Sequence, residues 1–361
     1  MKKTLYLHIG HYKTGTSALQ WFLANNARYL ARHGIEYLPG HEHSKHSRLA
    51  FALMRAAGVE TLMHGYADPT PPEQIWEAMI GQVRASAQPR VVLSSEEFIR
   101  LGAFGPATEH LAQIVAPTLA DDDIDIRIIA YLRSPGDHLR SWYNQLIKLG
   151  VSTPDFATAV SRRMDVIHYD YAAALKPWRE IFGADAVTVR PYVRGGDKDD
   201  ALLADFMGVL GVDWNGGAGA VLSDFDNNPR LPPEQMHLMR VTQSADQAPE
   251  AINWLMARAE AYFESDAGVM NSDAEGALAR VGEQIAHSLD ALADVLPAET
   301  LEAFRRDRAD TGLMSRSEAR AWQLAGFLLS ELHVQRLRTR QRQVQIEERL
   351  AAIEASLAAP E

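Results

Sequence analysis

The sequence predicts a three-layer α/β fold with a central, mostly parallel sheet of about five strands and a helical C-terminal portion. Five short apolar segments have the length and pattern of strands, and stretches of helical periodicity separate them. Strands joined through helices form parallel sheets, so helices should cover both faces. From Pro232 onward the strand signals stop and only the helical pattern continues.

The first strand is predicted at residues 4–9, where Leu5, Leu7 and Ile9 alternate with Thr4, Tyr6 and His8. After a glycine-containing loop, apolar residues at helical spacing predict a helix, namely Leu19, Phe22, Leu23 and Leu30. The remaining predicted strands are Ile35–Leu38, Arg90–Ser94, Ile126–Leu132 and Val187–Arg190. Residues 41–88 are interpreted as a helical excursion from the sheet.

The helix after the strand at 126–132 has the best-marked start. Ser134 is a good N-cap, and Pro135 suits the first turn ahead of Leu139 and Trp142.

Composition limits the functions that the chain can have. Its 361 residues carry a formal net charge of −11, which argues against a nucleic-acid partner, because phosphate backbones are bound by clustered Lys and Arg. The chain has no cysteine, so disulfides, thiolate nucleophiles and cysteine-based zinc sites are excluded. The apolar stretch at the N-terminus is too short for a signal peptide, and no apolar run approaches the ~20 residues of a membrane span. We therefore expect a cytoplasmic protein.

The most informative segment is the loop between the first strand and the first helix, residues 10–17. Free backbone N–H groups at a helix N-terminus form an anion site. Lys13 adds a positive charge, Thr14, Thr16 and Ser17 add hydroxyl groups, and Gly15 lies at the turn. An ordinary strand–turn–helix connection with an exposed lysine is the alternative. The loop predicts binding of a phosphate or a sulfate.

The order of residues within this loop distinguishes between two families. The P-loop of nucleotide kinases places glycine directly before the lysine, whereas here Tyr12 precedes Lys13. His8-Ile9-Gly10 followed by Lys13-Thr14-Gly15-Thr16-Ser17 and Leu19-Gln20 instead resembles the 5′-phosphosulfate loop of sulfotransferases. These enzymes use 3′-phosphoadenosine 5′-phosphosulfate (PAPS), and the bacterial members are the most similar. The resemblance implies a P-loop-like fold.

A second motif supports the resemblance. Arg133 ends the predicted strand 126–132, and Ser141 follows eight residues later in the next helix. In sulfotransferases this pair holds the 3′-phosphate, and a guanidinium can bind a phosphate through two charge-assisted hydrogen bonds. The resemblance also implies that Tyr192 approaches the adenine. The chain departs from the family by lacking the Arg-Lys-Gly-x-x-Gly segment of the animal cytosolic enzymes, and by having Asn228-Pro229-Arg230 where many bacterial members have Asn-x-Ser.

Sulfuryl transfer depends on positioning and charge stabilisation, as phosphoryl transfer does. Lys13 is expected to stabilise the leaving phosphate. Family members place a catalytic His or Glu near the end of a central strand, and Glu96 follows the strand 90–94. Alternatively, Ser94 or Ser95 is an N-cap and Glu96 only a first-turn acid. Glu36, at the end of the second strand, is the rival base.

The histidines His41, His43 and His46 lack an ordered carboxylate partner, so they are expected to line an acceptor cleft or face solvent rather than bind a metal. Sulfuryl transfer from PAPS requires no metal ion. The predicted function is transfer of a sulfuryl group from PAPS to a hydroxyl or amine, with a carbohydrate or glycan as the leading acceptor. Two alternatives remain, a P-loop kinase that uses ATP and magnesium, and a non-catalytic nucleotide-binding or scaffold protein.

The predicted organisation is one sulfotransferase domain, residues 1–330, with an α/β core at 1–230 and a helical portion at 231–330. Residues 331–361 form a C-terminal helix. Its apolar residues Ile346, Leu350, Ile353 and Leu357 have the 4-3-4 spacing of a coiled-coil seam. Self-association through this helix and packing of the helix on its own domain are both consistent with that spacing.

Overall fold

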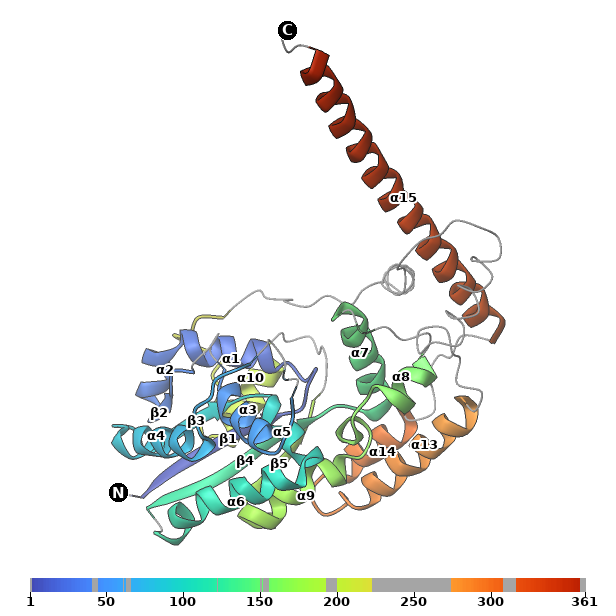
Figure 1. Cartoon of the computed structure of the whole chain (residues 1–361). Helices are drawn as coiled ribbons and strands as arrows, with labels where there is room; N and C mark the ends of the chain where they lie inside the picture. Colours follow the sequence, from blue (N-terminus) through green and yellow to red (C-terminus); the bar gives the residue numbers. More distant parts are fainter. Residues whose placement is uncertain are drawn as a thin grey trace. The chain divides into compact units, whose positions relative to one another are not determined.

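A computed structural model describes residues 2–40, 45–60, 62, 66–121, 123–149, 151, 156–192, 200–222, 274–307 and 316–357 (Figure 1). The predicted fold class is confirmed. Five parallel strands form one sheet in the order β2-β3-β1-β4-β5. The strands are β1 Lys3–Gly10, β2 Ile35–Tyr37, β3 Arg90–Ser94, β4 Ile124–Leu132 and β5 Val187–Pro191. Each coincides with a predicted strand to within two residues at either end.

The described helices fall between and after the strands. They are α1 Thr16–Asn25, α2 Ala27–Arg32, α3 Ser47–Ala56, α4 Pro72–Ala85, α5 Glu97–Arg100, α6 Gly105–Ala120, α7 Pro135–Lys148, α8 Phe156–Arg162, α9 Tyr171–Phe182, α10 Ala201–Val209, α13 Ala274–Asp290, α14 Ala298–Asp307 and α15 Arg316–Leu357. Short 3₁₀ turns occur at Leu101–Ala103, Val166–His168 and Ala184–Ala186. Helix α7 begins where the sequence predicts, and the His138 N–H donates to the Ser134 carbonyl oxygen at 2.8 Å.

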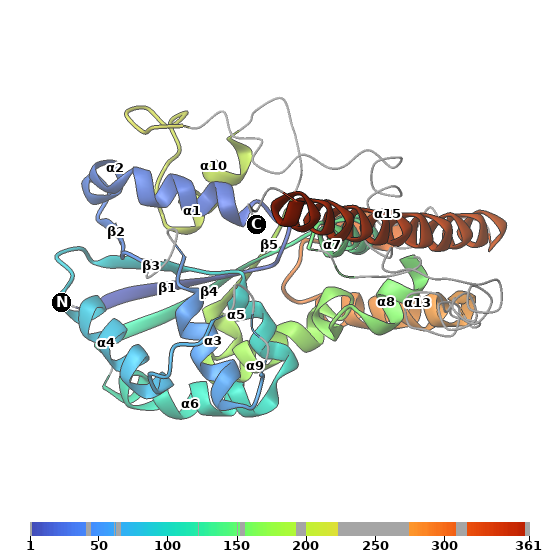
Figure 2. The same cartoon turned by 45° about the horizontal axis from the view of Figure 1, so that its top comes forward.

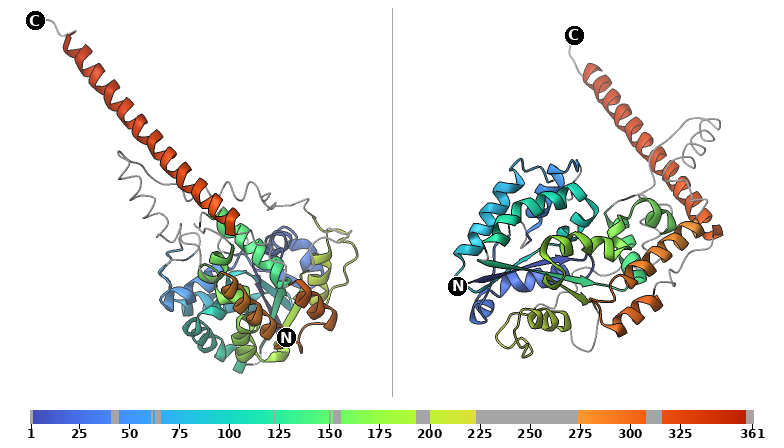
Figure 3. Two further views of the ribbon diagram at one scale, coloured as in Figure 1. Left: turned by 90° about the vertical axis from the view of Figure 1, so that its right-hand side faces the viewer. Right: turned by 90° about the horizontal axis from the view of Figure 1, so that it is seen from below.

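Helices cover both faces of the sheet (Figures 2 and 3). On one face α1, α2 and α10 pack through a buried cluster that includes Leu23 and Phe206 with Val92 and Tyr131 of the sheet. On the other face lie α3, α4, α5, α6 and α9 (Figure 2), where Phe98 contacts the rings of Trp76 and Trp178. Burial on both faces explains why the strands are continuous apolar runs.

The first predicted helix is two helices. Asn26 separates α1 from α2, and its side chain bonds both the Phe22 carbonyl oxygen and the backbone of Val221. The Asn26 amide bonds a chain segment that is far away in sequence. The residues around Asn26 therefore do not show that the helix is interrupted there. Leu30 therefore lies in α2, where it is still buried in the same cluster.

The chain divides into two compact units. The first comprises residues 1–140, 165–229 and 280–311, and thus contains the sheet, α13 in large part and α14. The second comprises residues 141–164, 230–279 and 312–361. Helix α15 begins at Arg316, earlier than the predicted C-terminal helix. The predicted domain boundaries stay a prediction. Within the described residues, no helix combines the length and the apolar composition that a membrane span requires.

Candidate functional site

The strand order makes the carboxyl end of β1 the switch point of the sheet. The chain passes from β1 to β2 and β3 on one side and then crosses to β4 on the other. Open α/β sheets bind ligands in the crevice at such a point. The segments that leave the sheet there are the loop after Gly10, Ser95–Glu97 after β3, Arg133 after β4 and Tyr192 after β5.

The loop between β1 and α1 has the conformation of an anion cradle. Lys13 has φ 63° and Gly15 has φ 77°, so the chain turns sharply twice before α1 begins at Thr16. The first N–H groups of α1 have no carbonyl partner within the helix and are available to a ligand. The hydroxyl groups of Thr14 and Thr16 both donate to the His11 carbonyl oxygen, at 2.6 and 3.2 Å. These two hydroxyls therefore hold the shape of the loop, while Ser17 is exposed.

Two glycines in this loop are required by close approach. A Cβ on Gly10, which has φ 96°, would lie 3.0 Å from the Cα atom of Glu96. A Cβ on Gly15 would lie 2.5 Å from Leu202 Cδ2 and 3.2 Å from Tyr192 Cε2. The glycines thus bring the loop against the segments that follow β3 and β5, which joins three predicted parts of the site.

Arg133 lies directly beside the lysine loop. Its Nη1 donates to the Lys13 carbonyl oxygen at 3.3 Å, and its guanidinium lies 5.8 Å from the centre of the Tyr192 ring. Nε donates to Asp137 Oδ2 at 2.7 Å, and Nη2 bonds the same oxygen. The Arg133 side chain is only 6% exposed. A guanidinium held by these bonds is fixed in direction beside the loop.

The structure brings most of the predicted site residues to one edge. Lys13, Thr14, Gly15 and Thr16 lie in the loop, with Arg133, Tyr192 and Glu96 around it. Ser141 lies on α7, eight residues after Arg133, and is buried. It is the first residue of the second compact unit. Asn228, Pro229, Arg230, His41 and His43 lie outside the described residues.

Glu96 is the centre of a polar network that the sequence did not predict in full. Its carboxylate accepts hydrogen bonds from Lys45 Nζ at 2.5 Å and from Gln20 Nε2 at 3.1 Å. Burial by itself raises the pKa of Glu96, but the Lys45 charge and the hydrogen bonds outweigh burial and lower that pKa below its ordinary value. Glu96 is therefore ionised at neutral pH. Nothing in the sequence marks Lys45, whereas Gln20 belongs to the loop pattern.

Glu97 has a different environment from its neighbour. It accepts a hydrogen bond from the Tyr12 hydroxyl at 2.6 Å and is buried. Burial raises the pKa of Glu97 to about 7, the Tyr12 bond opposes that shift, and the Glu96 charge adds to it. Two adjacent carboxyl groups thus have pKa values moved in opposite directions, as is common where one site needs both an ionised and a protonated acid.

Glu36 is placed away from this edge. It pairs in register with Val91, three residues before the end of β3, and accepts a hydrogen bond from Ser86. Its partner Ser86 directly follows α4, on the amino side of β3. The geometry therefore favours Glu96 over Glu36 as the carboxylate near the loop.

Among the described residues, five buried histidines surround the site. His8 Nδ1 lies 2.7 Å from Ser94 Oγ, and His46 Nδ1 accepts from the Ser94 N–H at 3.1 Å. His11, His138 and His168 form a second group, in which His138 Nε2 lies 3.0 Å from His168 Nδ1. Burial lowers the pKa of His8, His11 and His46 to about 4 and lowers those of His138 and His168 well below their ordinary value.

The nitrogens of His11, His138 and His168 lie within 4.8 Å of one another, close enough to suggest a cation site. However, His11 Nε2 is bonded to the Ile167 carbonyl oxygen at 2.8 Å, and His11 Nδ1 accepts from the Tyr12 N–H at 2.8 Å. A carbonyl only accepts, so Nε2 carries the proton and neither His11 nitrogen has a free lone pair. As arranged, the cluster supports the loop rather than offering three ligands.

These histidines predict loss of stability in mild acid. The unfolded chain takes up protons near pH 6.5, whereas the folded chain does so only near pH 4 or below, so the free energy of unfolding should fall as pH decreases from 6.5. Each histidine contributes up to about 1.4 kcal/mol per pH unit. The raised pKa of Glu97 has the opposite effect, because between pH 7 and 4.5 the folded chain binds this proton more readily than the unfolded chain does. Glu97 is a single group, so the five histidines should outweigh it. Urea unfolding followed between pH 7 and 4.5 measures this dependence, and unchanged stability would contradict it.

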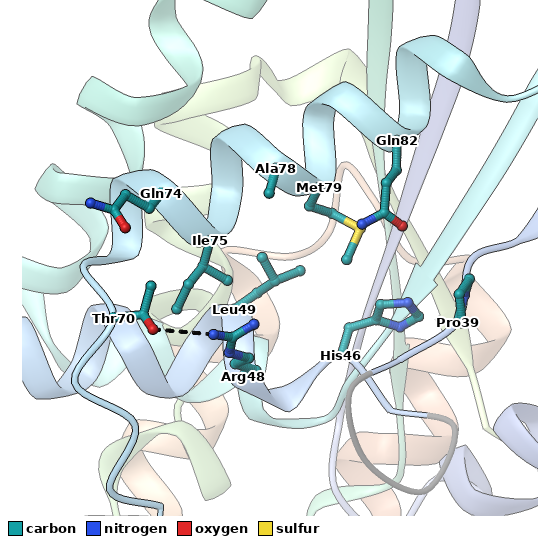
Figure 4. A pocket seen from close by; sticks show the side chains of 10 residues that line it. All are labelled: Pro39, His46, Arg48, Leu49, Thr70, Gln74, Ile75, Ala78, Met79 and Gln82. Atoms are coloured by element: carbon teal, nitrogen blue, oxygen red, sulfur yellow. Dashed lines mark hydrogen bonds between the residues drawn. The ribbon is translucent and has the colours of Figure 1, made fainter.

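A pocket of about 330 Å³ is lined by His46 and Arg48 together with residues of α4 (Figure 4). Its wall combines apolar side chains such as Leu49 and Met79 with the amides of Gln74 and Gln82. His46 lines it and also bonds the backbone of Ser94, two residues before Glu96. The sequence predicts that His46 lines an acceptor cleft or faces solvent; it is buried and lines this pocket, and use of the pocket by an acceptor stays a prediction.

Comparison with known proteins adds little at the level of sequence. No family model matches the chain, and no curated protein matches it. Among solved structures, the crystal structure of a sulfotransferase from Alicyclobacillus acidocaldarius aligns with 18% sequence identity and a TM-score of 0.40, covering 68% of this chain and 94% of that one. An alignment at this identity and TM-score assigns no reaction, so a function has to be inferred from the site residues themselves.

Proposed function

We propose that this protein is a sulfotransferase that moves a sulfuryl group from PAPS to a hydroxyl or amine of an acceptor. The observation that supports this best is the hydrogen bond from Arg133 to the Lys13 carbonyl oxygen, which joins the two anion motifs of the sequence. A donor with a phosphosulfate at one end and a 3′-phosphate at the other needs two such anion sites. A single-loop phosphate site would explain Lys13 but not Arg133.

The residues at this edge suit the two ends of that donor. The helix N-terminus and Lys13 would hold the phosphosulfate, with Arg133 and Ser141 on the 3′-phosphate and Tyr192 against the adenine. PAPS supplies an activated sulfuryl group together with a good leaving phosphate. The Glu96 carboxylate would take the proton that the acceptor hydroxyl loses, and Lys13 would stabilise the charge on the phosphate as the sulfur–oxygen bond breaks.

The acceptor site belongs on the Glu96 side of the loop. The pocket at His46 is connected to Glu96 through Ser94 on one side and Lys45 on the other. Amide groups next to apolar side chains suit an organic molecule with several hydroxyl groups, and a carbohydrate or glycan remains the leading class. Screening an acceptor library with labelled PAPS would identify it.

Arg133→Ala should weaken binding of 3′-phosphoadenosine 5′-phosphate (PAP) by about 1.5–3 kcal/mol, because charged hydrogen bonds to the 3′-phosphate are lost. Wild-type protein should bind PAP well and ATP poorly, with or without magnesium. Calorimetry with both ligands measures the difference, and a melting curve shows whether the variant is folded.

Arg127→Ala is the matched control. Arg127 lies on β4, the strand that Arg133 directly follows, but it bonds Asp125 and the Asp185 carbonyl oxygen, away from the carboxyl edge. Its loss should leave PAP affinity unchanged. Equal affinity of the wild type for PAP and ATP, or a magnesium requirement, would favour a kinase over the proposed sulfotransferase. PAP binding without transfer to any acceptor would favour a non-catalytic role.

A further inference from the structure

The C-terminal part of α15 exposes its whole circumference. Phe327 and Val334, in the first half of the helix, are buried. From Thr339 to Glu354, by contrast, every side chain is exposed. Most helices in proteins owe their stability to packing of an apolar face rather than to the intrinsic propensity of their residues. Among the described residues of its own compact unit, none buries this segment, so they do not supply the packing that normally stabilises a helix.

The exposed side chains include a regular apolar seam. Ile346, Leu350 and Ile353 are 57%, 53% and 56% exposed, and Leu357 continues their 4-3-4 spacing. In a heptad written abcdefg, this spacing puts isoleucine at d and leucine at a. Coiled coils bury such a seam against the same seam of other helices.

The charges beside the seam specify an orientation. Arg342 and Arg349 fall at g, and Glu347 and Glu354 fall at e. When parallel helices pair in register, each g residue faces the e residue five positions later on the neighbouring helix. Arg342 then faces Glu347 of another copy, and Arg349 faces Glu354. In an antiparallel pair g faces g, which would bring Arg342 and Arg349 of two copies together. The e positions also include Arg340, so the like charges that oppose this orientation are those at g.

We propose that residues 339–357 associate with the same segment of other copies of this chain as a parallel, in-register coiled coil. Leucine at a with isoleucine at d favours more than two strands. The positions before the seam are polar, Thr339 at d and Gln343 at a, so the apolar contact is short and association should depend on concentration and salt. This assembly is independent of the proposed enzyme activity.

Light scattering during size-exclusion chromatography tests the assembly on the full chain. We expect three or four times the chain mass of 40.0 kDa. Ile353→Asp should abolish it, while the variant keeps its fold because the position is exposed. Arg349→Glu should raise the Kd about tenfold at low salt, and adding Glu354→Arg should restore it, because the g–e attraction is reversed but kept. A single-chain mass at every concentration, or assembly that survives Ile353→Asp, would overturn the proposal.

The orientation has its own test, because the chain has no cysteine. Gln343→Cys puts one thiol at an a position, where a short bismaleimide should link two copies of a parallel, in-register assembly. Gln345→Cys, at the outward c position, is the matched control and should link poorly. Linking of the Gln345→Cys variant but not of the Gln343→Cys variant would overturn the parallel register.

Discussion

Replacing Lys13 with methionine should lower turnover about 10²- to 10³-fold, the usual effect of losing one preorganised electrostatic stabiliser. Binding of PAP should weaken far less, because the helix N-terminus and Arg133 would still hold the nucleotide. The expectation rests on the position of Lys13 in the loop that leads into α1, where it has φ 63°. Methionine is unbranched, lacks only the terminal ammonium position and is no more strained than lysine at that φ, so the comparison mainly removes the charge.

Single-turnover measurements with saturating PAPS separate the two effects for Lys13→Met. Lys176→Met is the control, since Lys176 is 71% exposed on α9 and pairs only with Glu180 among the described contacts. A variant whose PAP affinity collapses while its turnover at saturation stays normal would make Lys13 a binding residue only. That result would leave the Arg133 assignment intact.

The sheet could be predicted because its signals are local. Strands buried on both faces are short apolar runs, and each of the five stood out between polar segments. The anion loop could also be predicted, since strand, glycine, lysine and helix start follow one another within residues 3–17. The break at Asn26 could not, because its cause is a hydrogen bond to Val221.

The surroundings of the site were less accessible to prediction. Lys45 reaches Glu96 across 51 positions, and His11 meets His138 and His168 from two other elements. Tyr12 and Glu97 each lie next to a predicted site residue, but the hydrogen bond between them becomes evident only in the folded chain. Such contacts depend on which strands are neighbours in the sheet, here β1 with β3 and β4. The order of the strands follows from the fold of the whole chain, so it cannot be read from any one segment of the sequence.

Replacing Glu96 with glutamine should cut turnover by roughly 10²-fold or more, the usual contribution of a general base. Glutamine keeps the shape and can still bond Gln20, but it cannot accept the proton of the acceptor. PAP binding should be unchanged, since glutamine keeps the Cα and Cβ atoms that approach Gly10 and the bond to Gln20.

Glu36→Gln and Glu97→Gln complete the series and decide between the three acids. Glu36→Gln should turn over normally, because Glu36 bonds Ser86 at the level of Val91 and not at the strand end. Glu97→Gln removes the carboxyl whose pKa is raised to about 7, so any effect on turnover should appear as a change in the pH profile.

Rates are measured with the acceptor that the library screen identifies. A near-normal Glu96→Gln with an inactive Glu97→Gln would move the base to the acid bonded by Tyr12. An inactive Glu36→Gln would move it to β2. In either case Lys13 and Arg133 keep their roles, because their placement depends on the loop and on β4 rather than on the acid after β3.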